Sequence, residues 1–118
     1  MGAMSAPLYQ LKAEFFKTLG HPVRIRVLEL LSEREHGVAE MLRDTRVEPA
    51  YLSQQLAVLR RANLVVARRE GTAVYYALTS HQVADLLRTA RTILCGVLTN
   101  QTELLAALHT TPPREPAP

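Results

Sequence analysis

Cysteine and long apolar runs are scarce in this sequence of 118 residues. Cys95 is its only cysteine, so an intramolecular disulfide is impossible, which agrees with a reducing compartment. No apolar run forms a secretory h-region or approaches the roughly 20 residues that a membrane-spanning helix needs. We therefore expect a cytoplasmic protein with no membrane partner.

Motifs for catalysis are also missing. The chain has no glycine-rich phosphate loop, no serine or cysteine beside a plausible base, and no close pair of carboxylates in an apolar setting. These absences argue against an enzyme, and we identify no catalytic residue and no cofactor. The content of 47% apolar and 21% charged residues is typical of one globular domain with a real core.

The stretch from Glu48 to Thr79 begins with a helical pattern. Leu52, Leu56 and Leu59 recur at intervals of four and three, and Pro49 suits a first helical turn because its missing N–H costs nothing there. These leucines are expected to be buried. The opposite face is polar and suited to a groove, and it carries Tyr51, Ser53, Gln54, Gln55 and Arg61.

The second half of this stretch alternates with period two. LVVARR precedes the turn residues Glu70-Gly71-Thr72, and Val74, Tyr76 and Leu78 alternate with smaller or polar residues, which predicts a β-hairpin. Residues 50–69 contain no acidic residue and four arginines, a local charge of +4. These arginines are Arg60, Arg61, Arg68 and Arg69. A polyanion is the natural partner, and a polar helix followed by a basic hairpin is typical of a winged helix-turn-helix that binds DNA.

Three helices are expected before this stretch. The first places Leu8, Leu11, Phe15 and Leu19 on one stripe and ends at Gly20-His21-Pro22, where we assign His21 no function. The second begins at Pro22 and turns Ile25, Leu28 and Leu31 inward, leaving Arg24 and Glu33 outside. A connection at 35–37 leads to a short third helix, VAEMLRDT, with Val38, Met41 and Leu42 buried.

A last long helix follows Ser80, which is a good N-cap. Its apolar residues fall on two adjacent stripes, more than the core of a small domain needs, so a partner chain is implied. The stripes contain Val83, Leu86, Leu87, Ala90, Ile93, Leu94, Val97 and Leu98. We expect a homodimer through the first and last helices, with interface residues Leu8, Leu11, Phe15, Leu87, Ala90, Leu94 and Val97.

The expected organisation is mainly α, with four helices, a small β-hairpin wing and a fifth helix. Residues 1–7 are interpreted as a cloning scar and N-terminal arm, and residues 8–108 as one domain for DNA binding and dimerisation. Residues 109–118 contain four prolines, cannot hold a helix and are expected to be a disordered tail.

Two segments resemble the ArsR/SmtB family of small bacterial transcription regulators: FFKTLGHPVRIRVLELL, and LSQQLAVLRRANLVVARREGTAVYYALT. The likeness extends from about Leu8 to Leu98 and implies a winged helix-turn-helix that binds an inverted-repeat operator as a dimer. Gln55 stands in place of the family's usual histidine, so the operator sequence of relatives cannot be transferred. The residues expected to contact DNA are Pro49, Ala50, Tyr51, Ser53, Gln54, Gln55, Arg60, Arg61, Arg68, Arg69 and Thr72.

The resemblance also implies two kinds of metal site, and neither is intact here. The third helix lacks the family's Cys-x-Cys pair, and the family's ligand positions on the last helix are Ser80, Gln82, Ile93 and Gly96. We therefore predict no metal site and expect the signal to come from a partner molecule, most plausibly a protein co-regulator. An alternative is a zinc-, nickel- or cobalt-responsive repressor with a non-standard site, for which the candidates are His81, Asp85 and Cys95.

A second alternative is a winged-helix module that binds proteins and not DNA. The basic stripe argues against it, because an interaction surface has little use for four arginines beside a polar helix face.

Overall fold

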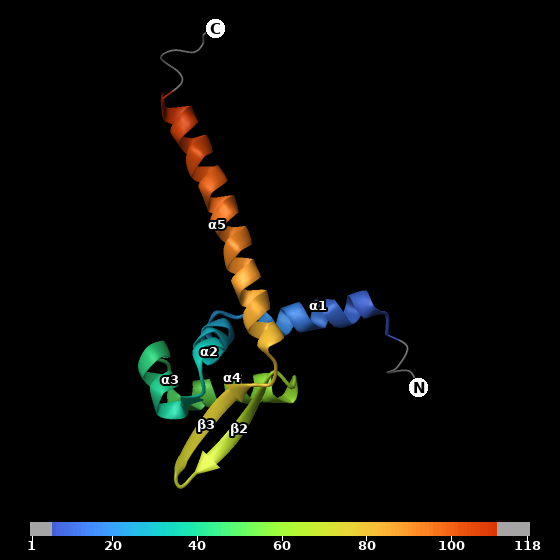
Figure 1. Ribbon diagram of the computed structural model, residues 1–118, viewed down its shortest axis with the longest axis vertical. Helices are drawn as coiled ribbons and strands as arrows, with labels where there is room; N and C mark the ends of the chain where they lie inside the picture. The colour runs from blue at the N-terminus through green and yellow to red at the C-terminus, as the bar shows by residue number, and fades with distance from the viewer. Residues whose placement is uncertain (1–5, 111–118) are drawn as a thin grey trace. The chain divides into compact units, whose positions relative to one another are not determined.

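The computed structural model describes residues 6–110 and contains five helices and three strands within them (Figure 1). Their order is α1 (Leu8–Leu19), α2 (Pro22–Glu33), β1 (His36–Gly37), α3 (Val38–Thr45), α4 (Pro49–Arg61), β2 (Val65–Glu70), β3 (Ala73–Leu78) and α5 (His81–Thr110). The chain divides into two compact units, the first ending at Ala84 and the second beginning at Asp85 within α5. This order confirms the predicted helices, hairpin wing and final helix.

The core of the first unit lies where α2, α3 and α4 meet. The leucine stripe of α4 is buried as predicted, with Leu52, Leu56 and Leu59 almost inaccessible to water. Leu28 of α2 and Met41 of α3 are also fully buried, and α2 packs against both α3 and α4. Each such side chain contributes about 1.5–3 kcal/mol relative to exposure. This burial fixes which face of α4 remains in solvent.

Two of the smaller burial predictions need correction. Of the three residues of α3 expected to be buried, only Met41 is; Val38 and Leu42 are half-buried. In α2, Ile25 is also half-buried, whereas Leu28 and Leu31 are buried as expected. A helix of eight residues covers the core with little more than two turns, so its flanking apolar residues stay partly open to solvent.

The sheet has the strand order β1-β3-β2, and all pairs are antiparallel. The hairpin is as predicted, with Val65 opposite Leu78 and Glu70 opposite Ala73. Gly71 has φ 64° at the first position of the two-residue turn, a conformation that glycine adopts without steric cost. β1 is the unpredicted element, because a strand of two residues has no periodicity to recognise.

The helix starts follow the expected chemistry. Pro22 and Pro49 occupy the first turns of α2 and α4. Ser80 Oγ accepts the Gln82 N–H at 3.1 Å, so Ser80 caps α5 as predicted. At the other end, α5 continues to Thr110. Residues 1–5 and 111–118, which include most of the expected N-terminal arm and tail, lie outside the described residues.

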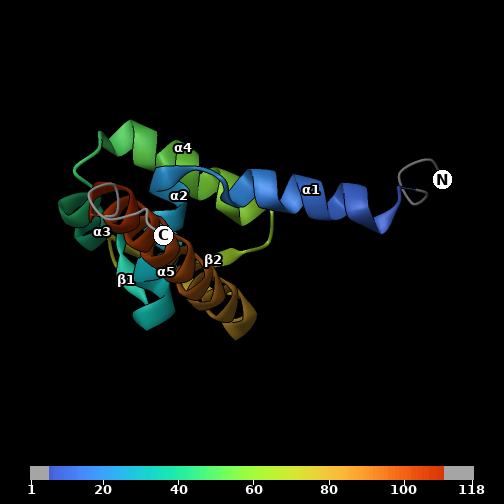
Figure 2. The same cartoon turned by 90° about the horizontal axis from the view of Figure 1, so that it is seen from above.

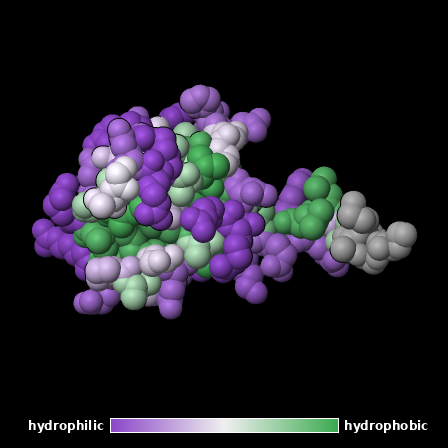
Figure 3. Space-filling model, turned by 90° about the horizontal axis from the view of Figure 1, so that it is seen from below, coloured by the Kyte–Doolittle hydropathy of each residue, from purple (hydrophilic) through white to green (hydrophobic). Residues whose placement is uncertain are grey.

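α1 leaves its apolar side chains largely in solvent. Within this helix only Leu19 is buried, whereas Leu8 is 64% and Leu11 54% exposed. Hydrophobic side chains gather on the arm formed by α1 (Figure 3). This is the first of the two apolar surfaces predicted to need a partner.

The second unit is the part of α5 that begins at Asp85, and its apolar residues are also exposed. Leu94 is 57% accessible, and the other exposed apolar residues are Ile93, Val97, Leu98, Leu104, Leu105 and Leu108. None of the helices within residues 6–110 is long and apolar enough to cross a membrane. This is the second of the apolar surfaces predicted to need a partner.

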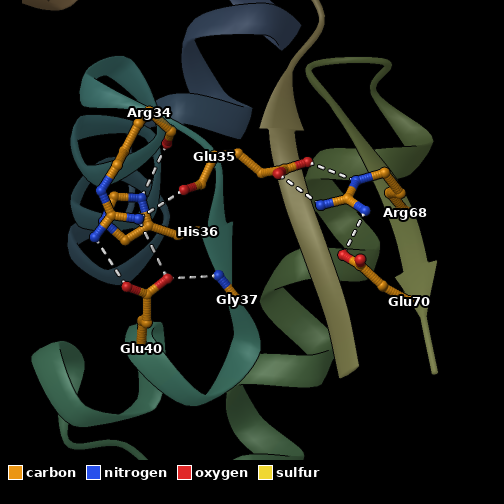
Figure 4. Close-up of polar contacts among 7 residues, drawn as sticks. All are labelled: Arg34, Glu35, His36, Gly37, Glu40, Arg68 and Glu70. Atoms are coloured by element: carbon orange, nitrogen blue, oxygen red, sulfur yellow. Dashed lines mark hydrogen bonds and ion pairs between the residues drawn. The ribbon is translucent and has the colours of Figure 1, made fainter. Parts of the chain in front are cut away.

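The start of α3 is held by an acidic residue (Figure 4). Glu40 Oε1 accepts the Gly37 N–H at 2.9 Å, which satisfies a donor at the helix N-terminus, and Glu40 Oε2 accepts from Arg34 Nη2 at 2.8 Å. The Arg34 hydrogen bond and then the Gly37 N–H lower the pKa of Glu40 from 4.5 to about 2. His36 Nδ1 donates to the Arg34 carbonyl at 2.9 Å and joins the same corner.

Replacing this carboxylate predicts a pH-dependent loss of stability. The folded-state pKa of Glu40 is depressed, so its contribution is complete above about 4.5 and disappears as the pH falls towards about 2. Glu40→Gln should therefore melt at a lower temperature than the unmodified chain at pH 7, and the two melting temperatures should converge at acid pH. Thermal unfolding followed by circular dichroism measures this. Glu14→Gln, on the exposed surface of α1, is the control, and a pH-independent difference for Glu40→Gln would contradict the explanation.

Candidate nucleic-acid interface

The solvent face of α4 carries most of the side chains predicted to contact DNA. Tyr51 is 37% accessible, and Ser53, Gln54, Arg60 and Arg61 are exposed. Pro49 and Ala50 are exposed at the start of the helix, and no side chain caps that start, because N-cap Glu48 makes no such bond. The exposed face therefore presents donors and acceptors near the start of the helix and positive charge at its end.

Gln55 does not belong to this face, which corrects the prediction. Its side chain is only 8% accessible, and its Oε1 accepts a hydrogen bond from Arg24 Nε at 2.8 Å. Arg24, expected outside, is half-buried for the same reason. Gln55 lies three residues after Leu52 and four before Leu59, so the helical spacing itself places it beside the buried stripe.

Tyr51 has a partner that the sequence did not reveal. Its hydroxyl oxygen lies 2.9 Å from Nε2 of His21, the residue just before α2, and the two ring centroids are 6.1 Å apart. His21 was assigned no function from the sequence. Thirty residues separate the two, and no local pattern links a turn histidine to a tyrosine on a later helix.

Arg68 and Arg69 are neighbours on β2, but the structure places them in different surroundings. Arg68 donates to both carboxylate oxygens of Glu35, at 2.7 and 3.0 Å, and to Glu70 at 2.9 Å (Figure 4). Its guanidinium also lies 4.8 Å from the centre of the Tyr75 ring. The hydrogen bond to Glu35 and then that to Glu70 raise the pKa of Arg68, and the same contact lowers the pKa of Glu35. The positive charge of Arg68 is thus largely offset within the chain.

Arg69 is next in sequence but lies on the other side of the strand. Alternate side chains of a strand point to opposite faces, so Arg69 is turned away from Glu35 and Glu70, and it is exposed. Thr72 is exposed in the turn at the tip of the wing. Arg60 Nη1 makes a long contact of 3.5 Å with the Tyr76 hydroxyl. The local charge of +4 inferred from residues 50–69 therefore overstates the free charge, because Glu35 is folded against it.

Two further arginines extend the basic surface beyond that stretch. Arg43 is exposed in the last turn of α3, and Arg46 is exposed directly after it with φ 58°, in the turn that leads to α4. Among residues 6–110, neither forms a salt bridge. The sequence reading missed them because Asp44 and Glu48 lie beside them in sequence, whereas Asp44 is paired with Arg26 in space.

The residues at the resembled metal positions do not fit a metal. Ser80 is engaged as the cap of α5, and Ile93 and Gly96 carry no donor side chain. Of the non-standard candidates, Asp85 forms a salt bridge with Arg88, and His81 and Cys95 are exposed. Within one chain, the described residues contain no group of three histidine, cysteine, aspartate or glutamate side chains that could hold a metal.

A polar helix on a three-helix core, followed by a paired wing, defines a winged helix-turn-helix protein. The family model described as "Bacterial regulatory protein, arsR family" matches residues 21–66. The uncharacterized HTH-type transcriptional regulator Rv0081 of Mycobacterium tuberculosis is 53% identical over 106 residues, which are 89% of this chain and 93% of that protein. The chain therefore belongs to the ArsR family of bacterial transcriptional regulators, DNA-binding proteins that are not enzymes.

Solved structures agree with this assignment. The crystal structure of Mycobacterium tuberculosis Rv0081 has a TM-score of 0.77 at 55% identity and covers 83% of this chain and 99% of its own. A homodimeric winged helix-turn-helix DNA-binding domain from Mycobacterium bovis, solved by NMR, has a TM-score of 0.70 at 30% identity. That comparison covers 79% of this chain and 86% of the other.

Proposed function

We propose that the chain acts in the cytoplasm as a homodimeric regulator that binds an inverted-repeat operator in a promoter. The observation that carries this proposal is the exposed polar and basic face of α4 beside a wing whose Arg69 is exposed and outside any salt bridge among residues 6–110. In this arrangement α4 enters the major groove and the wing lies against the neighbouring backbone. Family membership supports it, because the relatives are regulators with the same fold.

Residues in the first two turns of α4 are proposed to contact the bases. Gln54 offers an amide that can bind adenine N6 and N7 together, and Ser53 can donate or accept. Tyr51 adds a hydroxyl and an aromatic face, while Pro49 and Ala50 offer apolar contact, such as to a thymine methyl group. Each good base contact contributes about 1–3 kcal/mol of discrimination. Gln55 is left out because it is buried.

Phosphate contact falls to the exposed arginines on either side of this reading surface. Arg60 and Arg61 lie at the end of α4, Arg69 lies on the wing, and Thr72 lies at its tip. Arg43 and Arg46 extend the same role to the turn before α4. Arg68 is excluded from this group because two carboxylates already bind it.

The paired and unpaired arginines should separate in a salt titration. Arg61→Gln and Arg69→Gln should each reduce the slope of log Kd against log salt by about one, because each neutralises one phosphate. Arg68→Gln should change the slope less, and Glu35→Gln should increase it by releasing the Arg68 charge. Fluorescence anisotropy with a short duplex across a salt series measures these slopes. Equal effects of Arg68→Gln and Arg69→Gln, or salt-independent binding, would reject this division and favour the protein-binding module.

Dimerisation is proposed from the apolar faces that each unit leaves exposed. On α5, Leu87, Ala90, Leu94 and Val97 recur at intervals of three and four, so they share one face of the helix. On α1, the exposed residues Leu8 and Leu11 and the half-buried Phe15 provide a second apolar surface. A two-fold dimer spaces its reading helices about 34–36 Å apart, one turn of DNA, so each half-site meets one α4.

A charge on this face should separate the protomers. Leu94→Glu buries a carboxylate in the proposed apolar contact, so we expect a monomer at micromolar concentration and a loss of operator affinity. Thr92→Glu, which adds the same charge on the opposite side of α5, is the matched control and should stay dimeric. Light scattering with operator binding on the same samples measures both properties. A monomeric unmodified chain would defeat the proposal.

The signal is proposed to come from a second molecule, most plausibly a protein co-regulator that docks on the dimer or its C-terminal tail. A ligand shifts DNA affinity only through contacts that differ between the bound and free states. The resembled ligand positions hold Ser80, Gln82, Ile93 and Gly96, which supply no set of metal donors. The free dimer is therefore proposed to be the DNA-binding form.

Metal titration tests this part of the proposal. Calorimetric titration of the purified dimer with zinc, nickel or cobalt should show no tight stoichiometric site, because such ions need about four good donors. The opposite result would be sub-micromolar binding of one ion per protomer, lost in His81→Ala or Cys95→Ser and accompanied by release from DNA. It would establish the metal-responsive repressor instead.

A further inference from the structure

Two hydrogen bonds connect the start of α2 to the reading helix. His21 and Arg24 lie on the α2 side, and Tyr51 and Gln55 are one turn apart on α4, so the two contacts run side by side. Figure 2 shows α2 and α4 as neighbouring helices, in agreement with their packing contacts. The geometry therefore ties a base-reading residue and its buried neighbour to the junction between α1 and α2.

Arg24 joins three helices at this point. Its Nε donates to Gln55 Oε1 at 2.8 Å, and its Nη1 donates to the carbonyl of Thr18 in the last turn of α1, also at 2.8 Å. Both hydrogen bonds are partly buried, so breaking either leaves a polar group without its partner in a poorly solvated place. A guanidinium holds its donors in a rigid plane, so this contact resists rotation of α4 about its own axis.

The surroundings of His21 decide which way its hydrogen bond to Tyr51 runs. Nδ1 of His21 is buried and has no hydrogen-bond partner, whereas Nε2 faces the tyrosine oxygen at 2.9 Å. A neutral imidazole carries one N–H, and placing it on Nδ1 would bury an unpaired donor, which is rare in proteins. The proton therefore belongs on Nε2, which donates to the Tyr51 oxygen. The hydroxyl hydrogen of Tyr51 is then free to point outward.

We propose that His21 and Arg24 are positioning residues for DNA recognition. Arg24 acts through Gln55 to set the rotation of α4, and His21 acts through Tyr51 to make its hydroxyl an outward-facing donor. Such a donor selects an acceptor on a base edge, namely purine N7, guanine O6 or thymine O4. The inference rests on the proposed DNA-binding function and assigns a role to two residues outside the reading surface.

The proposed role of His21 is tested by comparing specific with non-specific DNA binding. A preferred duplex is first selected from random sequences, and Kd is measured for it and for an unrelated duplex. Tyr51→Phe and His21→Leu should each lower the specific-to-non-specific ratio about fivefold or more, and the double variant should lose no more than either single one. His21→Gln, which keeps a donor near the Nε2 position, should restore most of the ratio.

Two outcomes would overturn the proposed role of His21. If His21→Leu still lowers the ratio in the Tyr51→Phe background, His21 does not act through the tyrosine hydroxyl. If Tyr51→Phe weakens both duplexes equally, the hydroxyl binds phosphate and not a base. Melting temperatures of all variants are measured in parallel, because a merely structural loss would weaken both duplexes alike and leave the ratio unchanged.

The test of Arg24 adds a second readout, the slope of log Kd against log salt. Arg24→Met and Gln55→Met should lower the ratio without changing the slope, because Arg24 acts inside the protein and neutralises no phosphate. Gln55→Glu keeps an acceptor for Arg24 Nε and should retain the ratio. Arg26→Met is the matched control, since it removes an arginine of the same helix that pairs with Asp44. A fall of the slope by about one in Arg24→Met would make Arg24 a direct phosphate contact and overturn the assignment.

DNA binding by the unmodified chain distinguishes failure of the proposed function from failure of the positioning role. If it binds no duplex, or binds all duplexes equally, the proposed function fails. If it discriminates between sequences while the His21 and Arg24 variants keep the same ratio, only the positioning role fails.

Discussion

The structure depends on the burial of one stripe of leucines on α4. Leu52, Leu56 and Leu59 are buried where α4 packs against α2 and β2, and this burial leaves the remainder of the helix to solvent. A helix of 13 residues cannot turn without exposing those leucines, at a cost of about 1.5–3 kcal/mol for each. The wing follows α4 after three residues and pairs with β1, so its position is set by the same core. The burial of the leucine face of α4 therefore determines which face of the same helix is exposed for the proposed DNA contact.

Local periodicity explains how much of the fold could be predicted. The stripe of α4, the hairpin of β2 and β3 and the serine cap of α5 all follow from patterns within a few residues, and the structure confirms each. The misassigned features depend instead on contacts between distant segments. β1 exists because residues 36–37 meet the free edge of β3, and Arg68 is neutralised by Glu35, 33 residues away. Neither the pairing of β1 with β3 nor the ion pair of Arg68 with Glu35 can be inferred from the residues of one short sequence window.

Gln55 shows a different kind of failure, because its position was available from the sequence. Its spacing from Leu52 and Leu59 places it next to the buried stripe, but its amide suggested a DNA contact. A buried amide is tolerated only with a partner, and that partner, Arg24, was itself expected to be solvent-exposed. The two errors have one cause: each residue was judged by its own polarity, whereas the pair satisfies itself inside the protein. Polar residues next to an apolar stripe therefore need to be examined in pairs.

The same pair lies between the surfaces proposed for assembly and for DNA reading. Through Arg24, the end of α1 at Thr18 is hydrogen-bonded to the same side chain that holds Gln55 of α4. α1 also exposes the apolar residues proposed to meet a second protomer. The planar guanidinium of Arg24 makes both hydrogen bonds at once, so its position is fixed jointly by the end of α1 and by Gln55. Coupling between assembly and DNA reading requires contacts that differ between states. In the proposed dimer, these two partly buried hydrogen bonds are the contacts through which a change at the end of α1 would reach Gln55 of α4.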